Sequence, residues 1–586
     1  MKFSLRHIIL LIFVGLCVLG LSIRLIDLQI WNKDFLIHQG DARVLRDVNL
    51  RANRGMIVDR LGAPLAVSAP VESVWLNPRI FLAETTISSK SPSKSKSPLK
   101  SKSPSKSKSA LKSPLKSLSD TLAISYKNLS TNLLKHKDRE FMFVARQVTP
   151  QVANAVKDLN IPGVYLQREY RRYYPLGEAA LQVIGVTNID GRGQEGLELT
   201  YNSILTGQPG LKRVLKDRKG HIVDDLEMIR PSIPGQTLTL SLDRRLQYLA
   251  YRELKSAVKK HRALGGSLVL LDVDTGEILA MVNQPAFNPN NRANMLSSHL
   301  RNRAVTDIFE PGSVMKTFSI LAALESGKYT AKSMVNTHPG YMYVRGNRHP
   351  IKDLHNYGLI DLTTVFKKSS NVGISTVILT LPRDTLGNMY TRMGFGQSTG
   401  IDFPGEQSGV LNIPRAHDDF GYSTLAFGYS LSATTLQLAS AYATIASGGI
   451  RYPVSLLKQN EAPTGERVLS QEAADEIKMM LAAVDADVAT TDANKEGIVK
   501  MGYPMAGKSG TVRKLGPNGY DAKRHLSLYA GFAPVSRPKF VMALMIDEPR
   551  AGEYYGRAVA APVFKQVMLG SLRLYNISPE KIDPPL

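Results

Sequence analysis

The sequence predicts three parts: a single-pass N-terminal transmembrane helix, a mixed α+β module, and a C-terminal α/β domain with a five-stranded antiparallel sheet flanked by helices. Three observations support this fold class. An uninterrupted apolar run extends from Ile8 to Ile23. From Gln236 onwards, alternating and helical apolar patterns become regular. Two pairs of apolar stretches flank the turn signals Asp274-Thr-Gly276 and Pro534-Val-Ser-Arg-Pro538, which is typical of β-hairpins.

The apolar run is interpreted as an uncleaved membrane anchor within residues 1–30. The run is short for a span, but Arg24 can snorkel and Leu25–Ile30 is still mostly apolar. A cleaved signal peptide is the alternative, although no small-x-small cleavage site follows the run. Because Lys2 and Arg6 precede it, the N-terminus is expected in the cytoplasm and the remainder outside the membrane.

Residues 31–234 are expected to form a spacer module without a catalytic constellation. Strand-like residues lie around Gly55–Val67, and helical patterns cover Leu118–Leu134 and Thr149–Leu159. A Lys/Ser/Pro tract at 88–117 interrupts this module, and its two tandem units agree at ten of twelve positions. Such a composition cannot build a core, so the tract is expected to be disordered.

The chain is strongly basic, with a net charge of +24 to which this tract contributes. Nucleic acid is not expected as a partner, because the tract lacks aromatic residues and lies outside the cytoplasmic membrane. The preferred interpretation is a tolerated insertion; a tether to anionic lipid or wall polymer is the alternative. Cys17 is the only cysteine, so no intrachain disulfide and no thiolate metal cluster are expected.

The C-terminal domain, residues 235–586, is predicted from its strand and helix signals. Asp243 is an acidic N-cap that opens a helix. We expect the sheet to have the helix that begins at Ser313 on one side and a C-terminal helix, roughly Val559–Leu574, on the other. Its five strands are Ser267–Val273, Glu277–Val282, Lys508–Val512, Leu526–Ala533 and Phe540–Ile546.

Three short strings in this domain contain the groups of an acyl-transfer site: Ser313-Val-Met-Lys316, Ser369-Ser-Asn371 and Lys508-Ser-Gly-Thr511. They offer a serine to attack, a lysine to take its proton, a polar pair to relay it and a cationic strand to hold a carboxylate. Ser-x-x-Lys alone is a weak signal, since it also recurs within the tract at 88–117. Order, wide spacing and local structure carry the interpretation.

Local structure supports Ser313 as the nucleophile. The breaker cluster Phe309-Glu-Pro-Gly312 precedes an apolar helical pattern, so Ser313 is expected at the start of a buried helix. Residues three apart share a helix face, which places the Lys316 amine beside the Ser313 hydroxyl. Burial would lower the pKa of Lys316 and favour the neutral form that acts as a base. The alternative is a serine N-cap followed by a surface lysine.

The third string also fits a phosphate-binding loop formally, in Gly502-Tyr-Pro-Met-Ala-Gly-Lys-Ser509. That loop must be followed by a helix, and Gly510 is a poor helix former. A strand that presents Lys508, Ser509 and Thr511 to a ligand is the preferred interpretation.

The three strings resemble those of penicillin-binding proteins and serine β-lactamases. Further motifs resemble the class B penicillin-binding proteins, in particular the division-specific peptidoglycan D,D-transpeptidases: Arg303-Ala-Val-Thr-Asp-Ile-Phe-Glu-Pro-Gly-Ser313, Lys368-Ser-Ser-Asn-Val-Gly-Ile-Ser375, Phe427-Gly-Tyr429 and Tyr529-Ala-Gly-Phe-Ala-Pro534. Upstream motifs resemble that family's N-terminal module: Arg54–Ala66, Arg171-Arg-Tyr-Tyr-Pro-Leu-Gly177 and Gly193-Gln-Glu-Gly-Leu-Glu198.

The resemblance implies a pedestal module, also called a dimerisation module, and a penicillin-binding transpeptidase domain of the serine β-lactamase-like fold, with no glycosyltransferase domain. The implied substrate is a peptidoglycan stem peptide ending in D-Ala-D-Ala. Ser313 would attack its penultimate carbonyl after Lys316 takes the hydroxyl proton. Ser369 would pass a proton to the leaving D-Ala, and Asn371 would hydrogen-bond the substrate backbone.

The remaining implied residues bind the substrate. Lys508, Ser509 and Thr511 would hold the terminal carboxylate, with Gly510 between them. Backbone N–H groups of Ser313 and Thr511 would stabilise the oxyanion, at about 3 kcal/mol per donor.

The implied partners are a SEDS-family membrane glycosyltransferase, other division proteins, and β-lactams as covalent inhibitors. The implied location is the bacterial inner membrane, with the catalytic domain in the periplasm. Alternatives are an elongation-type class B transpeptidase, a membrane-anchored serine β-lactamase or antibiotic sensor, and a catalytically silent scaffold.

Overall fold

The computed structural model divides the chain into two compact units that interleave in sequence. It describes residues 5–88, 106–216, 222–292, 295–345, 347–489, 502–517 and 519–580. The first unit comprises Met1–Arg54, Ala69–Arg171 and Thr206–Gly235. The second unit comprises Gly55–Ser68, Arg172–Leu205 and Gln236–Leu586.

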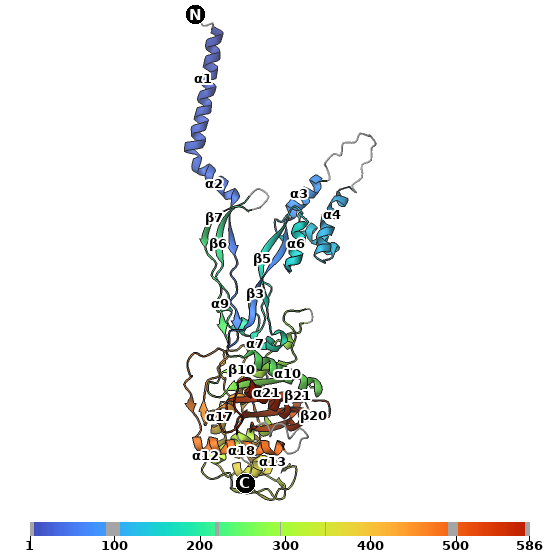
Figure 1. The fold of residues 1–586 in the computed structure, drawn as a ribbon, viewed down its shortest axis with the longest axis vertical. Helices are drawn as coiled ribbons and strands as arrows, with labels where there is room; N and C mark the ends of the chain where they lie inside the picture. The colour runs from blue at the N-terminus through green and yellow to red at the C-terminus, as the bar shows by residue number, and fades with distance from the viewer. Residues whose placement is uncertain are drawn as a thin grey trace. The chain divides into compact units, whose positions relative to one another are not determined.

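The predicted membrane helix is present. Helix α1 (Leu5–Ile26) continues through one π-helical segment, η1 (Asp27–Trp31), and is followed by α2 (Lys33–Val44) (Figure 1). The stretch Leu5–Trp31 is long and apolar enough to cross a membrane, and none of its most apolar part is buried against protein. This exposure is consistent with a single-pass membrane anchor.

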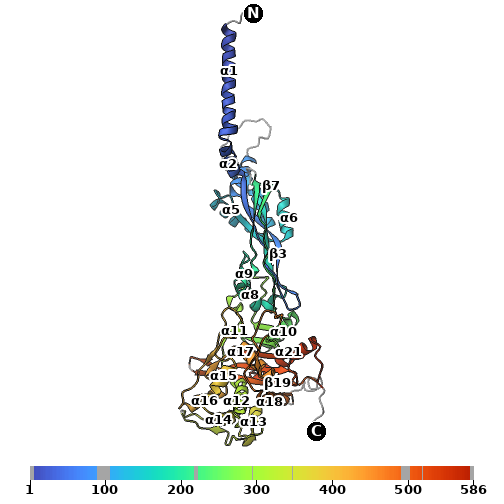
Figure 2. The same cartoon turned by 90° about the vertical axis from the view of Figure 1, so that its left-hand side faces the viewer.

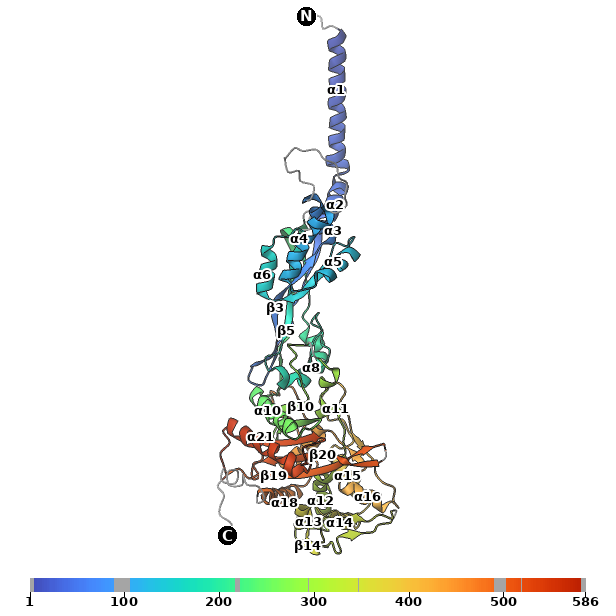
Figure 3. The same cartoon turned by 90° about the vertical axis from the view of Figure 1, so that its right-hand side faces the viewer.

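Two groups of strands and four helices make up the rest of the first unit. One sheet has the order β1 (Leu45–Leu50), β6 (Gly210–Lys216) and β7 (Ile222–Arg230). Strand β3 (Pro64–Leu76) pairs with β4 (Met142–Val148) and β5 (Val164–Tyr173). The helices near β3 and β5 are α3 (Pro78–Ser88), α4 (Lys106–Thr121), α5 (Tyr126–Lys135) and α6 (Pro150–Asp158) (Figure 3).

Two of the three predicted stretches of the spacer are confirmed directly. Helix α6 occupies the predicted stretch at Thr149–Leu159, with the Thr149 hydroxyl accepting from the Val152 N–H as an N-cap. The strand-like residues around Gly55–Val67 include β2 (Ile57–Val58) and the start of β3. The predicted helical stretch at Leu118–Leu134 is divided between the end of α4 and α5, because Ala123 has a positive φ of 52°.

The predicted disorder of the tract at 88–117 is wrong for its last part. Helix α4 begins at Lys106, inside the tract. Leu115 and Leu118 on α4 are fully buried in a core with Val74 and Phe81. The composition of the tract hides Leu115, whose burial compensates for the surrounding polar residues. Residues 89–105 lie outside the described part of the chain.

The predicted five-stranded antiparallel sheet of the second unit is confirmed with all its strands. Its order is β10 (Ile278–Gln284), β9 (Gly265–Asp272), β21 (Phe540–Asp547), β20 (Gly519–Ala533) and β19 (Ala506–Gly516). The two hairpin signals join β9 to β10 and β20 to β21. Strand β19 completes the sheet beside β20, with Thr511 opposite Ser527.

Helices cover both faces of this sheet (Figures 1 and 2). On one face lie α10 (Arg244–Lys260), capped by Asp243 as predicted, and the predicted C-terminal helix, α21 (Ala561–Leu574). On the other lie α12 (Lys316–Glu325), α17 (Thr435–Ala446) and α18 (Gln471–Ala489). Successive residues of β9 alternate between the two cores: Leu268 and Leu270 lie in the core with α10, whereas Val269 and Leu271 lie in the core with α17.

Shorter elements complete the second unit: η2 (Gly177–Ala180), α7 (Leu181–Ile184), α8 (Gly196–Thr200), α9 (Asn202–Leu205), β8 (Leu238–Thr239), η3 (Ser297–His299), α11 (Arg303–Thr306), η4 (Gly312–Met315), β11 (Met334–Asn336), β12 (Tyr341–Met342), β13 (Ile351–Lys352), β14 (Leu359–Asp361), α13 (Leu362–Lys368), α14 (Asn371–Ile378), α15 (Thr385–Arg392), β15 (Val410–Leu411), α16 (Asp419–Ala426), β16 (Leu431–Ser432), β17 (Ile450–Arg451), β18 (Glu466–Arg467) and α20 (Gly556–Val559).

Candidate active site

Ser313 lies in the 3₁₀ turn η4, which leads directly into the buried helix α12, as the breaker cluster predicts. Two glycines let strand β19 approach this turn closely. A Cβ on Gly312, whose φ is 57°, would lie 2.4 Å from Val512 Cγ2. A Cβ on Gly510 would lie 3.0 Å from the carbonyl oxygen of Pro311. Gly510 therefore has a steric reason to be in the third string, since a larger residue would push the strand away from the serine turn.

Lys316 connects the first string to the second. Its side chain is only 1% exposed. Its Nζ contacts the carbonyl oxygen of Ser369, lies 3.1 Å from Ser369 Oγ and donates to Asn371 Oδ1 at 2.7 Å. Among the described residues, Ser313 Oγ has no hydrogen bond. The predicted pairing of the Lys316 amine with the Ser313 hydroxyl therefore stays a prediction.

Burial lowers the pKa of Lys316 well below 10.5, as the sequence suggests, and the nearby positive charge of Lys508 lowers it further. The carboxylate of Asp353 acts in the opposite direction. Lys316 Nζ is the donor in all three contacts, to the carbonyl oxygen and Oγ of Ser369 and to Asn371 Oδ1. A neutral amine is the form that can act as a general base.

Lys508 reaches the same hydroxyl from the third string. It is buried on β19, and its Nζ lies 3.2 Å from Ser369 Oγ and 3.2 Å from the carbonyl oxygen of Ser509. Burial, with the charge of Arg557 in addition, lowers the pKa of Lys508 to about 8. Ser369 Oγ thus lies between two lysine amines, at a position from which it can relay a proton.

The second string is held by an aspartate that the sequence reasoning missed. The Asp353 carboxylate accepts hydrogen bonds from Ser370 Oγ and from the N–H groups of Asn371 and Val372, the last at 3.0 Å. Ser369 has a positive φ of 55° at the end of α13, and this turn directs its hydroxyl and carbonyl to Lys316. No local pattern marks Asp353, which lies in a loop after β13.

The third string is part of a strand and not of a phosphate-binding loop. β19 continues through Gly516, where a nucleotide loop would require a helix, so the strand prediction is confirmed. Thr511 Oγ1 accepts the N–H of Gly556 at 2.9 Å. Its hydroxyl proton remains available to an anionic ligand. Ser509 is half-buried next to Lys508 on the same strand.

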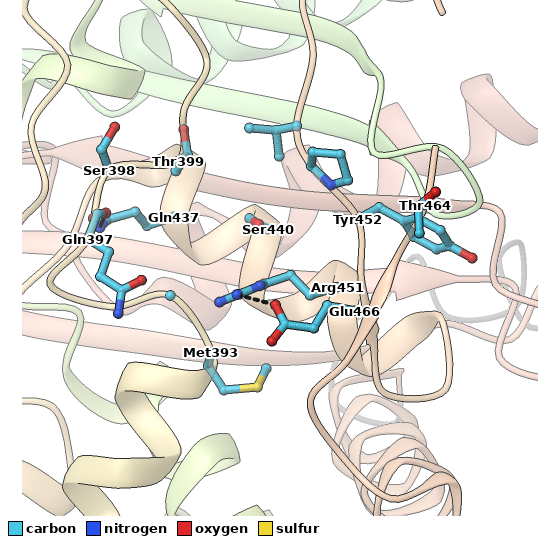
Figure 4. Close-up of a pocket in the computed structure, with 13 residues that line it drawn as sticks. Met393, Gln397, Ser398, Thr399, Gln437, Ser440, Arg451, Tyr452, Thr464 and Glu466 are labelled. Atoms are coloured by element: carbon cyan, nitrogen blue, oxygen red, sulfur yellow. Dashed lines mark hydrogen bonds and ion pairs between the residues drawn. The ribbon is translucent and has the colours of Figure 1, made fainter. Parts of the chain in front are cut away.

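A separate polar pocket of about 350 Å³ lies elsewhere in the second unit (Figure 4). An ion pair between Arg451 and Glu466 crosses it, and Gln437 and Ser440 of α17 also line it. The Gln437 amide is already bonded to backbone oxygens. None of the three strings contributes to this pocket, so it is distinct from the candidate active site.

Two further motifs from the sequence form a buried ion pair within the second unit. Arg172 Nε donates to Glu198 Oε1 at 2.6 Å, and both side chains are at most 3% exposed. Arg172 Nη1 also donates to Ser68 Oγ at 3.1 Å. The pair joins the last residues of β5 to α8 within the second unit. These two strings therefore have a structural explanation.

Comparison with known proteins identifies two families along the chain. The penicillin-binding protein transpeptidase domain matches residues 266–569, and the penicillin-binding protein dimerisation domain matches residues 49–240. Peptidoglycan D,D-transpeptidase FtsI of Escherichia coli K12 is 40% identical over 555 residues, covering 95% of this chain and 89% of that protein. The probable peptidoglycan D,D-transpeptidase PenA of Neisseria gonorrhoeae is 39% identical, covering 94% of this chain and 90% of that protein.

Solved structures agree with the fold. The transpeptidase domain of Burkholderia pseudomallei penicillin-binding protein 3 is 36% identical, with a TM-score of 0.52, covering 59% of this chain and 98% of that chain. A peptidoglycan synthetase from Bifidobacterium adolescentis has a TM-score of 0.67 over 92% of this chain and 98% of that chain; at 24% identity it supports the fold alone.

Proposed function

The chain belongs to the class B penicillin-binding proteins and is an FtsI-like peptidoglycan D,D-transpeptidase, and from this premise we propose which of its residues carry the reaction. Such an enzyme forms cross-links in the cell wall during division and is a target of β-lactams. The observation that best supports the assignment is the position of Ser369 Oγ, 3.1 Å from the Lys316 amine and 3.2 Å from the Lys508 amine.

In the proposed acylation, Lys508, Ser509 and Thr511 bind the terminal carboxylate of the donor stem. Neutral Lys316 takes the hydroxyl proton of Ser313 as Ser313 Oγ attacks the carbonyl of the penultimate D-Ala. Backbone N–H groups of Ser313 and Thr511 stabilise the oxyanion, while Gly510 allows the strand to lie close enough to do so.

Collapse of the tetrahedral intermediate breaks the peptide bond. Protonated Lys316 returns a proton through Ser369 to the leaving D-Ala nitrogen, and Asn371 holds the donor backbone. The amine of an acceptor stem then attacks the Ser313 ester. Its proton passes to Lys316 and on to Ser313 Oγ, so the cross-link forms and the enzyme is restored without a cofactor.

Covalent labelling with a fluorescent penicillin tests the nucleophile. Ser313→Ala should abolish the adduct at an unchanged thermal midpoint, because the hydroxyl makes no hydrogen bond among the described residues. Ser326→Ala is a matched control at the other end of α12, outside the three strings. A stable adduct on the Ser313→Ala variant, located by mass spectrometry on another residue, would refute the assignment.

We further propose that the catalytic unit lies on the periplasmic side of the membrane. Lys2 and Arg6 precede the apolar helix, which favours a cytoplasmic N-terminus. Protease added to spheroplasts should therefore digest the second unit. Protection of that unit until the membrane is permeabilised would require the opposite orientation.

A partner that polymerises glycan is proposed because a transpeptidase needs fresh strands to cross-link, and the two matched families are transpeptidase and dimerisation domains. A SEDS-family polymerase would pack against the exposed apolar side chains of α1. Replacing α1 with an unrelated apolar span should preserve penicillin acylation but weaken co-purification of the polymerase. If co-purification and stimulation of the polymerase are both undiminished, the anchor only attaches the enzyme to the membrane and does not bind the polymerase.

A further inference from the structure

The segment after β21 is fixed to the sheet at the position of the carboxylate-binding string. Gly556 N–H donates to Thr511 Oγ1 at 2.9 Å, and Ser527 Oγ donates to the carbonyl oxygen of Tyr554 at 2.7 Å. Thr511 and Ser527 are opposite one another in the pairing of β19 with β20. Two hydrogen bonds therefore attach residues 554–556 to one register position of the sheet.

The attachment is also tight sterically. A Cβ on Gly556 would lie 2.2 Å from the carbonyl oxygen of Gly510 and 2.6 Å from that of Leu528. Only glycine allows the segment to lie directly on the strand that carries Lys508 and Thr511. The next residue, Arg557, is exposed. The backbone before Arg557 is thus held by contacts to the third string and to the neighbouring strand β20.

We propose that Arg557 is a second cation of the carboxylate subsite and contributes, with Lys508 and Thr511, to capture of donor stems that end in a free carboxylate. This inference rests on the proposed function, because it assumes that the third string holds that carboxylate. The roles differ: Lys508 is buried beside the reacting groups, whereas Arg557 is solvent-accessible and attracts the arriving anion.

The electrostatics of the site agree with this placement. Two causes lower the pKa of Lys508: burial is the larger, and the positive charge of Arg557 is the second. Two like charges repel one another, and a carboxylate bound near both relieves the repulsion.

The test compares two thioester donors with the full-length chain in detergent micelles: benzoyl-D-alanyl thioglycolate, which ends in a carboxylate, and its carboxamide. Arg557→Gln should raise KM for the carboxylate donor on the order of tenfold, with kcat nearly unchanged, and leave the carboxamide unaffected. Arg557→Lys should recover part of the loss. High salt should reduce the difference between wild type and Arg557→Gln.

Arg537→Gln is the matched control, since it removes the same charge from the β20–β21 turn. Equal losses for both donors, or an unchanged KM for the carboxylate donor, would overturn the role of Arg557. Ser313→Ala in the same series separates the two proposals: turnover that survives Ser313→Ala refutes the nucleophile, whereas a wild-type KM in Arg557→Gln refutes only the second cation.

Discussion

At the scale of the residue, burial of Lys316 favours the neutral amine that the proposed mechanism requires of its base. The amine is enclosed by α12, Ser369 and Asn371, and desolvation outweighs the nearby Asp353 carboxylate. Because the pKa is far below 10.5, a useful neutral fraction exists at lower pH than for an exposed lysine.

Lys316→Ala should slow penicillin acylation by about 10²–10⁴, the range for a lost general base. In the wild type, acylation should rise with pH as Lys316 loses its proton, with a midpoint well below 10.5. Stopped-flow measurement of acylation between pH 5 and pH 10 would check this, since the Lys316→Ala variant should not show the rise with pH. If the variant shows the same rise, another group is responsible for it.

Asp353→Asn should shift the rise of acylation with pH to lower pH. The Asp353 carboxylate raises the pKa of Lys316, and the amide of the variant lacks the negative charge that causes this. Acylation should also slow, since the loop with Ser370 and Asn371 loses charge-assisted bonds. Asp361→Asn is the control: Asp361 caps the neighbouring helix α13 through the Thr364 N–H. The same kinetic change in both variants would show a merely structural effect.

Glu548 makes stability depend on acid pH. Burial alone would raise its pKa, but hydrogen bonds from Lys514, Arg524 and Arg550 lower it to about 2. The folded pKa is below the unfolded value of about 4.3, so the stabilisation is complete above that value and is lost as pH falls towards 2.

Glu548→Gln should therefore lower the thermal midpoint at pH 7, and the gap to wild type should narrow from pH 4.5 downwards. Differential scanning fluorimetry across this range measures the gap. Glu553→Gln, an exposed neighbour, should leave the midpoint unchanged. A gap that stays constant down to pH 2 would contradict the lowered pKa.

At the scale of the element, the ion pair between Arg172 and Glu198 fastens β5 to α8. Glu198→Ala leaves a buried guanidinium uncompensated and should lower the free energy of unfolding by about 3–5 kcal/mol. Guanidinium-induced unfolding checks this value. Arg79→Ala breaks an exposed pair with Glu140 and should cost about 0–1 kcal/mol. Equal losses would show that burial does not determine the contribution of the pair.

At the scale of the whole molecule, the Lys/Ser/Pro tract consists of parts with different roles. Leu115→Ala should destabilise the first unit by about 2–5 kcal/mol, because Leu115 is fully buried. Deleting residues 89–105 should leave both the thermal midpoint and penicillin acylation unchanged, since no catalytic string lies there. A deletion that destabilises as much as Leu115→Ala would show that the repeat itself contributes to the core.

The elements of the second unit could be predicted from local sequence patterns. Turn residues and apolar alternation act between near neighbours, so the five strands, the Asp243 cap and the helix after Ser313 could all be predicted. The three strings indicated the chemistry for a similar reason, because each string can be recognised from its own few residues and from its order in the chain. The Lys/Ser/Pro composition of the tract misled the prediction at Leu115, because composition does not show which of the few apolar residues are buried.

The contacts between strings that are distant in sequence could be seen only in the folded chain. Ser369 Oγ lies between amines that are 53 and 139 residues away in sequence, and no periodicity encodes such a meeting. The same holds for Asp353, for Arg557 beside the third string, and for the lowered pKa of Lys316. Desolvation and charge proximity depend on how the elements pack in three dimensions, so the reactivity of the site arises only when α12, α14 and β19 come together.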